Sequence, residues 1–143
     1  PAKILRLAHT LLEDNGIVCC VAPNDFSPVQ KTLSERLNYA HYWLAPPHHI
    51  NYFNHATLST LLERCGFSVI GSTSMFPMDF FLLMGDNYVG NDEVGRASHS
   101  RRKRLDIMLN EPALREFKKE MYGIMAKHGI GREAVIFGKK EKR

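Results

Sequence analysis

Histidines and aromatic side chains gather in one short stretch of the chain. Residues 39–53 include two prolines together with His41, Tyr42, Trp43, His48, His49, Asn51, Tyr52 and Phe53. This composition is typical of a structured loop rather than of a helix or a strand. An aromatic wall with a few polar groups is the common lining of a small-molecule pocket, so the stretch is the best candidate for a substrate site. A histidine there can act as a general base, because its unperturbed pKa lies near neutral pH. A structural hydrogen bond is the alternative role for any one of these histidines.

A second candidate is the turn Pro23-Asn24-Asp25, which follows an unbroken apolar run. Ligands of open α/β sheets bind beyond the carboxyl ends of parallel strands, so Asn24 and Asp25 are candidate substrate-binding residues. The same three residue types are also common in a turn that ends a strand. The sequence leaves both interpretations open.

Other chemistries are not favoured by the residue spacings. The histidines and Cys65 match no common zinc pattern, so we expect no metal site. The run of residues 101–104 is basic and is interpreted as a solvated helix face. A second basic cluster closes the chain: Lys139, Lys140, Lys142 and Arg143. Two local clusters without interleaved aromatics do not make a basic face, which argues against a nucleic-acid partner.

Periodicity and stop signals indicate how these residues are positioned. Helices are expected at residues 2–13, 28–38, 55–65, 94–110 and 112–128, with Asn15-Gly16 and Gly66 as stop signals. Strands are expected at residues 17–22, 67–70 and 132–138. Residues 75–90 are expected to be irregular and to form core or a lid over the pocket. The pattern predicts an α/β layer structure.

The first strand carries a further implication. It is apolar on both faces, as in a parallel sheet covered by helices. One of its edges has no evident partner unless a strand precedes it or another molecule supplies one, so self-association through this edge is one way to complete the sheet.

Composition sets the broad class. The chain has 143 residues, of which 44% are hydrophobic and 24% charged, and a formal net charge of +4. These values predict one globular domain or part of one. No run is long enough for a membrane span. The odd number of cysteines, three, predicts reduced core residues and a cytoplasmic location.

Four passages in this order resemble the second half of a class I, Rossmann-like methyltransferase domain that uses S-adenosylmethionine. The first is the helix before Asn15-Gly16 with the strand that ends in Pro23-Asn24. The second is the sequence His-Ile-Asn-Tyr-Phe at residues 49–53, and the third is the helix ending in Gly66-Phe67. The fourth is the stretch from Gly129 to Glu133 and the strand after it.

The resemblance implies a partial Rossmann-like sheet made of the family's fifth, sixth and seventh strands, with covering helices. Residues 1–143 would be the C-terminal part of a single domain, with a helical insertion at about residues 91–128 before the last strand. That strand should lie between the other two and run antiparallel to both. His49 is the candidate catalytic base, and the partner would be a small-molecule or other methyl acceptor.

The chain departs from the family in lacking a glycine-rich turn after a strand and an acidic residue at the end of the next strand. Those parts hold S-adenosylmethionine, so the cofactor-binding residues are expected before Pro1 and we expect the cofactor not to bind this chain alone. The alternative function is a non-catalytic α/β interaction module that works through the aromatic loop and the basic helix.

Overall fold

The computed structural model describes residues 1–141, so Lys142 and Arg143 of the C-terminal basic cluster lie outside the described residues. The described strands are β1 (Ile17–Pro23), β2 (Phe67–Thr73) and β3 (Glu133–Lys140). They form one sheet in the order β1-β3-β2, in which β3 runs antiparallel to both neighbours. The expected place and direction of the last strand are therefore confirmed, and the fold is mixed α/β.

Strand β1 has one covered face and one bare face. Val18, Cys20 and Ala22 pack against the main core, whereas Ile17 and Val21 on the other face are 56% and 57% exposed. The expectation of helices on both faces is therefore wrong for the described residues. Cys19 is also exposed, so it is not the core residue that was expected. Among residues 1–141, β1 pairs only with β3, and its outer edge is free.

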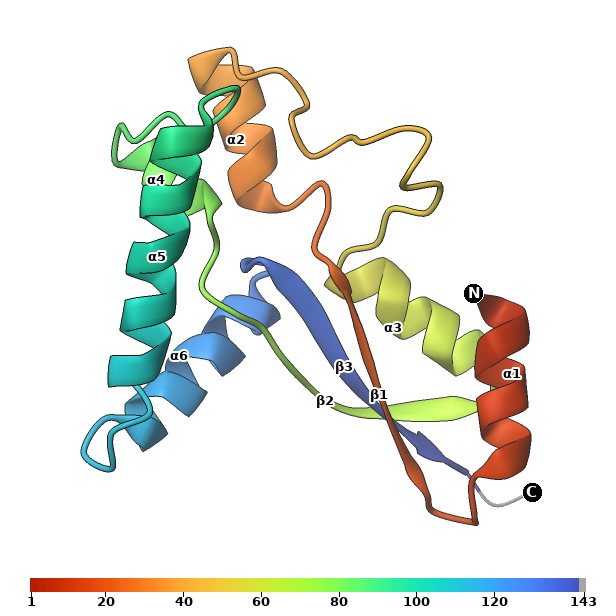
Figure 1. Ribbon diagram of the computed structural model, residues 1–143. Coiled ribbons are helices and arrows are strands. Elements are labelled where there is room, and N and C mark those ends of the chain that lie inside the picture. The colour runs from red at the N-terminus through yellow and green to blue at the C-terminus, as the bar shows by residue number, and fades with distance from the viewer. Residues whose placement is uncertain (142–143) are drawn as a thin grey trace.

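Helix α1 (Ala2–Leu11) and helix α3 (His55–Arg64) lie on one side of the strands in Figure 1. Leu5 of α1 and Leu58 and Leu62 of α3 pack on Ala134 and Ile136 of β3, and this cluster is the main core. Helix α1 ends two residues earlier than expected. Asn15, rather than Gly16, takes the left-handed conformation, with a φ of 63°.

Helix α2 (Pro28–Leu37) and α3 begin with the caps that their sequences indicate. Ser27 and Gln30 form a capping box at α2, and Asn54 and Thr57 form one at α3. Each pair satisfies two backbone N–H groups that the helix itself cannot, which fixes where the helix starts. Between the two helices, residues 38–54 form the expected irregular loop.

The chain between β2 and β3 holds three helices: α4 (Asp79–Leu83), α5 (Asp92–Met108) and α6 (Arg115–Lys127). Helix α4 corrects the expectation of a wholly irregular stretch at residues 75–90. It forms because Phe81 and Leu82 are buried, and Leu82 packs with Val29 and Leu33 of α2 in a second core cluster. Helices α5 and α6 lie within the residues expected for the insertion, and Figure 1 shows α5 away from α1 and α3.

Helix α6 leaves two large apolar side chains exposed. Phe117 and Ile124 are 56% and 61% exposed, whereas Tyr122 and Ala126 are buried. The hydroxyl of the buried Tyr122 donates a hydrogen bond to Asp106 of α5. The basic run of α5 is also only partly solvated, because Arg102 is buried and pairs with Asp106 at 2.7 Å.

No helix within residues 1–141 has the length and apolar character needed to cross a membrane.

Candidate functional site

Asn24 ties the end of β1 to the turn before β3. Its side-chain Nδ2 donates hydrogen bonds to the carbonyl oxygens of Gly129 and Gly131, at 2.8 and 3.0 Å, and its backbone N–H donates to Arg132. The residue is 2% exposed, and among residues 1–141 its buried Oδ1 has no hydrogen-bond partner. The amide nitrogen is thus engaged in the fold, whereas Oδ1 is buried without a partner.

Asp25 is 5% exposed and lies directly beside the aromatic loop. Its backbone N–H donates to the Phe53 carbonyl at 2.6 Å, which holds the loop against the end of β1. Burial raises the pKa of the Asp25 carboxyl because the charged form loses water. The charge of His49 lowers this pKa, and the charge of Asp79 raises it further. Two acids and a histidine therefore lie within electrostatic reach of one another.

Asp79, the first residue of α4, is the second buried acid of the site and is also 5% exposed. The Tyr42 hydroxyl donates a hydrogen bond to its Oδ1. Burial raises the pKa of Asp79, and the hydrogen bond from Tyr42 lowers it. The pKa values of Tyr42 and Tyr88 are raised by burial and by the charge of Asp79. None of residues 1–141 forms a salt bridge to Asp25 or Asp79.

Aromatic rings surround these acids. The Trp43 ring lies 5.6 Å from that of Phe26 and 5.2 Å from that of Tyr42, and the Tyr42 and Tyr88 rings are 6.2 Å apart. These edge-to-face contacts favour one arrangement of the loop. Trp43 Nε1 is buried without a hydrogen-bond partner among the described residues. Phe26 has a φ of 54°, a conformation that bulky residues rarely adopt and that is found preferentially at functional sites.

The structure brings together some of the residues that the sequence singled out. Asp25, Tyr42, Trp43 and His49 lie in one cluster, and the Tyr52 ring is 6.3 Å from that of His49. Phe53 contributes its carbonyl to this cluster, while its ring packs on the main core. His48, His49 and Asn51 are exposed, and none of the three side chains forms a hydrogen bond within residues 1–141. The catalytic role of His49 and the substrate-binding roles of all the other residues remain predictions.

Sequence reasoning missed Asp79 and Tyr88, because they lie in a stretch with no regular pattern. One signal was present: Asp79 is an acid between Phe76 and Phe80, inside a run of apolar and aromatic residues. A charged residue in such a run is buried only when it has a polar partner. That partner, Tyr42, lies 37 residues away, so periodicity could not reveal it.

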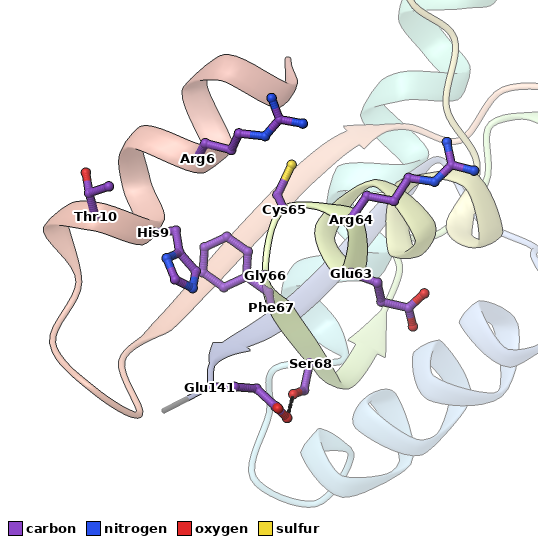
Figure 2. Close-up of a pocket in the computed structure, with 10 residues that line it drawn as sticks. All are labelled: Arg6, His9, Thr10, Glu63, Arg64, Cys65, Gly66, Phe67, Ser68 and Glu141. Carbon is purple, nitrogen blue, oxygen red and sulfur yellow. Dashed lines mark hydrogen bonds between the residues drawn. The ribbon is translucent and has the colours of Figure 1, made fainter. Parts of the chain in front are cut away.

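A separate hollow lies at the opposite end of the sheet. Figure 2 shows the His9 ring beside Phe67, with Arg6, Glu63, Arg64 and Glu141 around them. The His9 and Phe67 rings meet edge to face at 5.1 Å. This hollow is at the amino ends of β1 and β2, the wrong end for a ligand of an open α/β sheet. Its charges are of both signs and face solvent. We therefore place the candidate site at the carboxyl end of β1.

Among residues 1–141, no group of three or more histidine, cysteine, aspartate or glutamate side chains is placed to hold a metal ion.

The model of a family described as a methyltransferase domain matches residues 1–71. Residues 1–71 are part of a methyltransferase-like domain. The match runs from α1 into β2, so it includes the turn after β1 and the aromatic loop but not Asp79. No curated protein and no solved structure matches the chain.

The described residues do not form a cradle for S-adenosylmethionine. Such a cradle needs a glycine turn after a strand with open space beside it. Gly129 and Gly131 come before a strand. A Cβ atom added to Gly131 would lie 1.7 Å from Ser74 Oγ, so the space beside this glycine is filled by the protein itself.

Proposed function

We propose that this chain is the acceptor-side part of an S-adenosylmethionine-dependent methyltransferase domain of the class I, Rossmann-like type. In this proposal the chain supplies the fifth, sixth and seventh strands, and the strands that hold the cofactor lie along the free edge of β1. The observation that carries the proposal is the position of the buried acid and aromatic cluster. It lies at the carboxyl end of β1, beside a strand edge and an apolar face that no described element covers.

The free edge of β1 supports a continued sheet rather than a finished one. Ile4, Leu7 and Leu11 of α1 are exposed, and so are Ile17 and Val21 of β1. An unpaired apolar strand edge is an aggregation hazard that native proteins cover. In this proposal, further strands of the same domain cover the edge of β1. Two observations support this: residues 1–71 match a methyltransferase domain, and the described residues lack a cofactor cradle.

The residues of the site have separate roles in this proposal. The rings of Phe26, Tyr42 and Trp43 form a wall that holds the acceptor and excludes water. His49 accepts the proton of the nucleophile on an imidazole nitrogen, and the nearby Asp25 carboxylate stabilises the resulting imidazolium. Asp79 holds the Tyr42 hydroxyl and so positions the wall. Transfer from a sulfonium needs orientation and a dry pocket more than covalent help.

The acceptor in this proposal is a small molecule or another carrier of the nucleophile. A cytoplasmic location is part of the same proposal, because Cys19, Cys20 and Cys65 are free thiols and Cys19 is exposed. Free exposed thiols are typical of reducing compartments.

Titration calorimetry with S-adenosylmethionine tests the proposal. We expect no binding to residues 1–143 alone, and binding to a longer natural product of the same gene that carries the preceding strands. Micromolar binding to residues 1–143 alone would show that the cofactor site has been misplaced. Lack of binding to every longer form would favour an interaction module.

Variants of the longer form then separate catalysis from binding. His49→Gln should lower methyl transfer by about 10²-fold or more, because general bases contribute about 10²–10⁴-fold, and should leave the affinity for S-adenosylmethionine unchanged. His99→Gln removes a histidine of α5 and serves as the matched control with unchanged transfer. Equal rates for the two variants would exclude His49 as the base.

A further inference from the structure

A cavity of about 460 Å³ lies where α2 and α3 both begin. Its wall includes Ser27 and Pro28 from the start of α2, Asn54 and His55 from the start of α3, and Lys127 from the end of α6. Val69 and Ser72 of β2 and Ile136 of β3 form the rest of its floor. The cavity is therefore built from five separate elements and has no part in the hollow of Figure 2.

The charged groups around this cavity have one sign. Lys31 and Lys127 line it, and no aspartate or glutamate does. Neither α2 nor α3 has an acidic residue in its first turn. The amino end of a helix carries a partial positive charge, so two converging helix starts and two lysines give a positive field in the cavity. Nothing among the lining residues neutralises that field.

The wall of the cavity also holds hydrogen-bond donors that have no partner among residues 1–141. The His55 side chain is 8% exposed, and neither ring nitrogen has a partner among residues 1–141. Burial lowers the pKa of His55, which favours the uncharged imidazole with one N–H to donate. The caps of α3 satisfy Asn54 and Thr57 but leave the backbone N–H groups of His55 and Ala56 free within the described residues. A buried donor without a partner calls for a water molecule or a ligand oxygen.

We propose that this cavity binds a phosphate group, with Lys31 and Lys127 as its counter-charges and the start of α3 as its donor set. A phosphate dianion matches two lysines and two helix starts better than a singly charged carboxylate does. The cavity is larger than a phosphate ion needs, which favours the phosphate of a monoester. Phe26 lines the cavity and also packs against Trp43, so the cavity adjoins the aromatic wall. The proposal does not depend on methyl transfer.

Calorimetric titration of residues 1–143 with two probes, inorganic phosphate and glycerol 3-phosphate, tests the assignment at constant ionic strength. The double variant Lys31→Ala/Lys127→Ala should bind at least about tenfold more weakly than the wild type. The matched control is Lys3→Ala/Lys119→Ala, which removes the same charge from exposed positions outside the cavity and should change the affinity by less than about twofold.

The signals of the His55 ring in an NMR pH titration give a second measurement. Phosphate should raise the pKa of His55 in the wild type and in the control, and should leave it unchanged in the Lys31→Ala/Lys127→Ala variant. Tighter binding of glycerol 3-phosphate than of inorganic phosphate assigns the site to an ester, and equal binding assigns it to the free ion. Equal losses in the two double variants, or no binding of either probe at millimolar concentration, would overturn the proposal.

Discussion

The two ends of helix α3 show how differently the two ends of this sheet are built. At its amino end lie the turn after β1, the aromatic loop and the positive cavity, with Asn24, Asp25 and Asp79 almost fully buried. At its carboxyl end lies the hollow of Figure 2, where Arg6, Glu63, Arg64 and Glu141 are exposed. The same helix and sheet thus separate an end with buried polar groups from an end with solvated ones.

This difference indicates which end of the sheet holds the functional site. Solvated charges of both signs screen one another and contribute little to binding. Buried polar groups lose water, and each needs a partner within the protein or on a ligand. Asn24 Oδ1, Trp43 Nε1 and His55 have no such partner within residues 1–141, and all three lie at the amino end of α3 or beside it.

The largest expected loss of stability comes from a substitution at one of two glycines that both have positive φ. Gly131→Ala should destabilise the protein by about 4 kcal/mol or more, because its Cβ would lie 1.7 Å from Ser74 Oγ and 2.6 Å from Ser74 Cβ. Gly66→Ala at the other end should cost about 1–2 kcal/mol, since its φ of 95° is strained but its nearest neighbour is the movable His9 ring. Urea denaturation measures both, and equal costs would show that the two ends are equally rigid.

The next effect tests the hydrogen bonds that close the site. Asn24→Ala removes the donor of two bonds to backbone carbonyls and leaves Gly129 and Gly131 short of a partner, so we expect a loss of about 2–3 kcal/mol. Thr10→Ala near the Figure 2 hollow removes one exposed bond to Leu7 and should cost less than about 0.5 kcal/mol. Thermal unfolding measures the loss of stability in both variants. A small loss for Asn24→Ala would mean that other contacts hold the turn.

The smallest effect is a pH dependence. Burial raises the pKa of Asp79 in the folded state, so above about pH 4, the ordinary carboxyl value, the folded state holds a proton that the unfolded state has lost. The free energy of unfolding therefore falls as the pH rises above about 4. The titratable groups near Asp79 and Asp25 are Tyr42, Tyr88 and His49.

Asp79→Asn should flatten this fall, because the amide cannot ionise. Tyr42→Phe should extend it to higher pH, because the hydrogen bond that lowers the Asp79 pKa is lost. Urea midpoints between pH 4 and pH 8 measure both slopes. A wild-type stability that rises across this window would contradict the assignment.

Much of the fold was predictable because its signals are local. Ser27, Asn54 and Gly66 lie at helix boundaries and act through contacts within four residues, and the expected stop at Gly66 is confirmed. The irregular loop and the order of the strands also followed from local composition and from the family resemblance. The early end of α1 was less predictable, because helix ends fray and depend on packing.

The candidate site was predictable only in part. Asp25, Tyr42 and Trp43 were identified because their types and neighbours are unusual in the sequence. Asp79 and Tyr88 were not, because their relation to Tyr42 depends on how residues 74–91 fold back on α2. The cavity at the helix starts combines five segments, and no spacing in the chain links Lys31 to Lys127.

By itself, the sequence determined the caps, the turns, the apolar runs and the likeness to a methyltransferase, since each of these is written in neighbouring residues. Only the tertiary structure decided which face of β1 is bare, which side of α6 is buried and which acids lose their water. Those features depend on contacts between residues far apart in the chain. Burial and electrostatic fields arise only when distant segments meet.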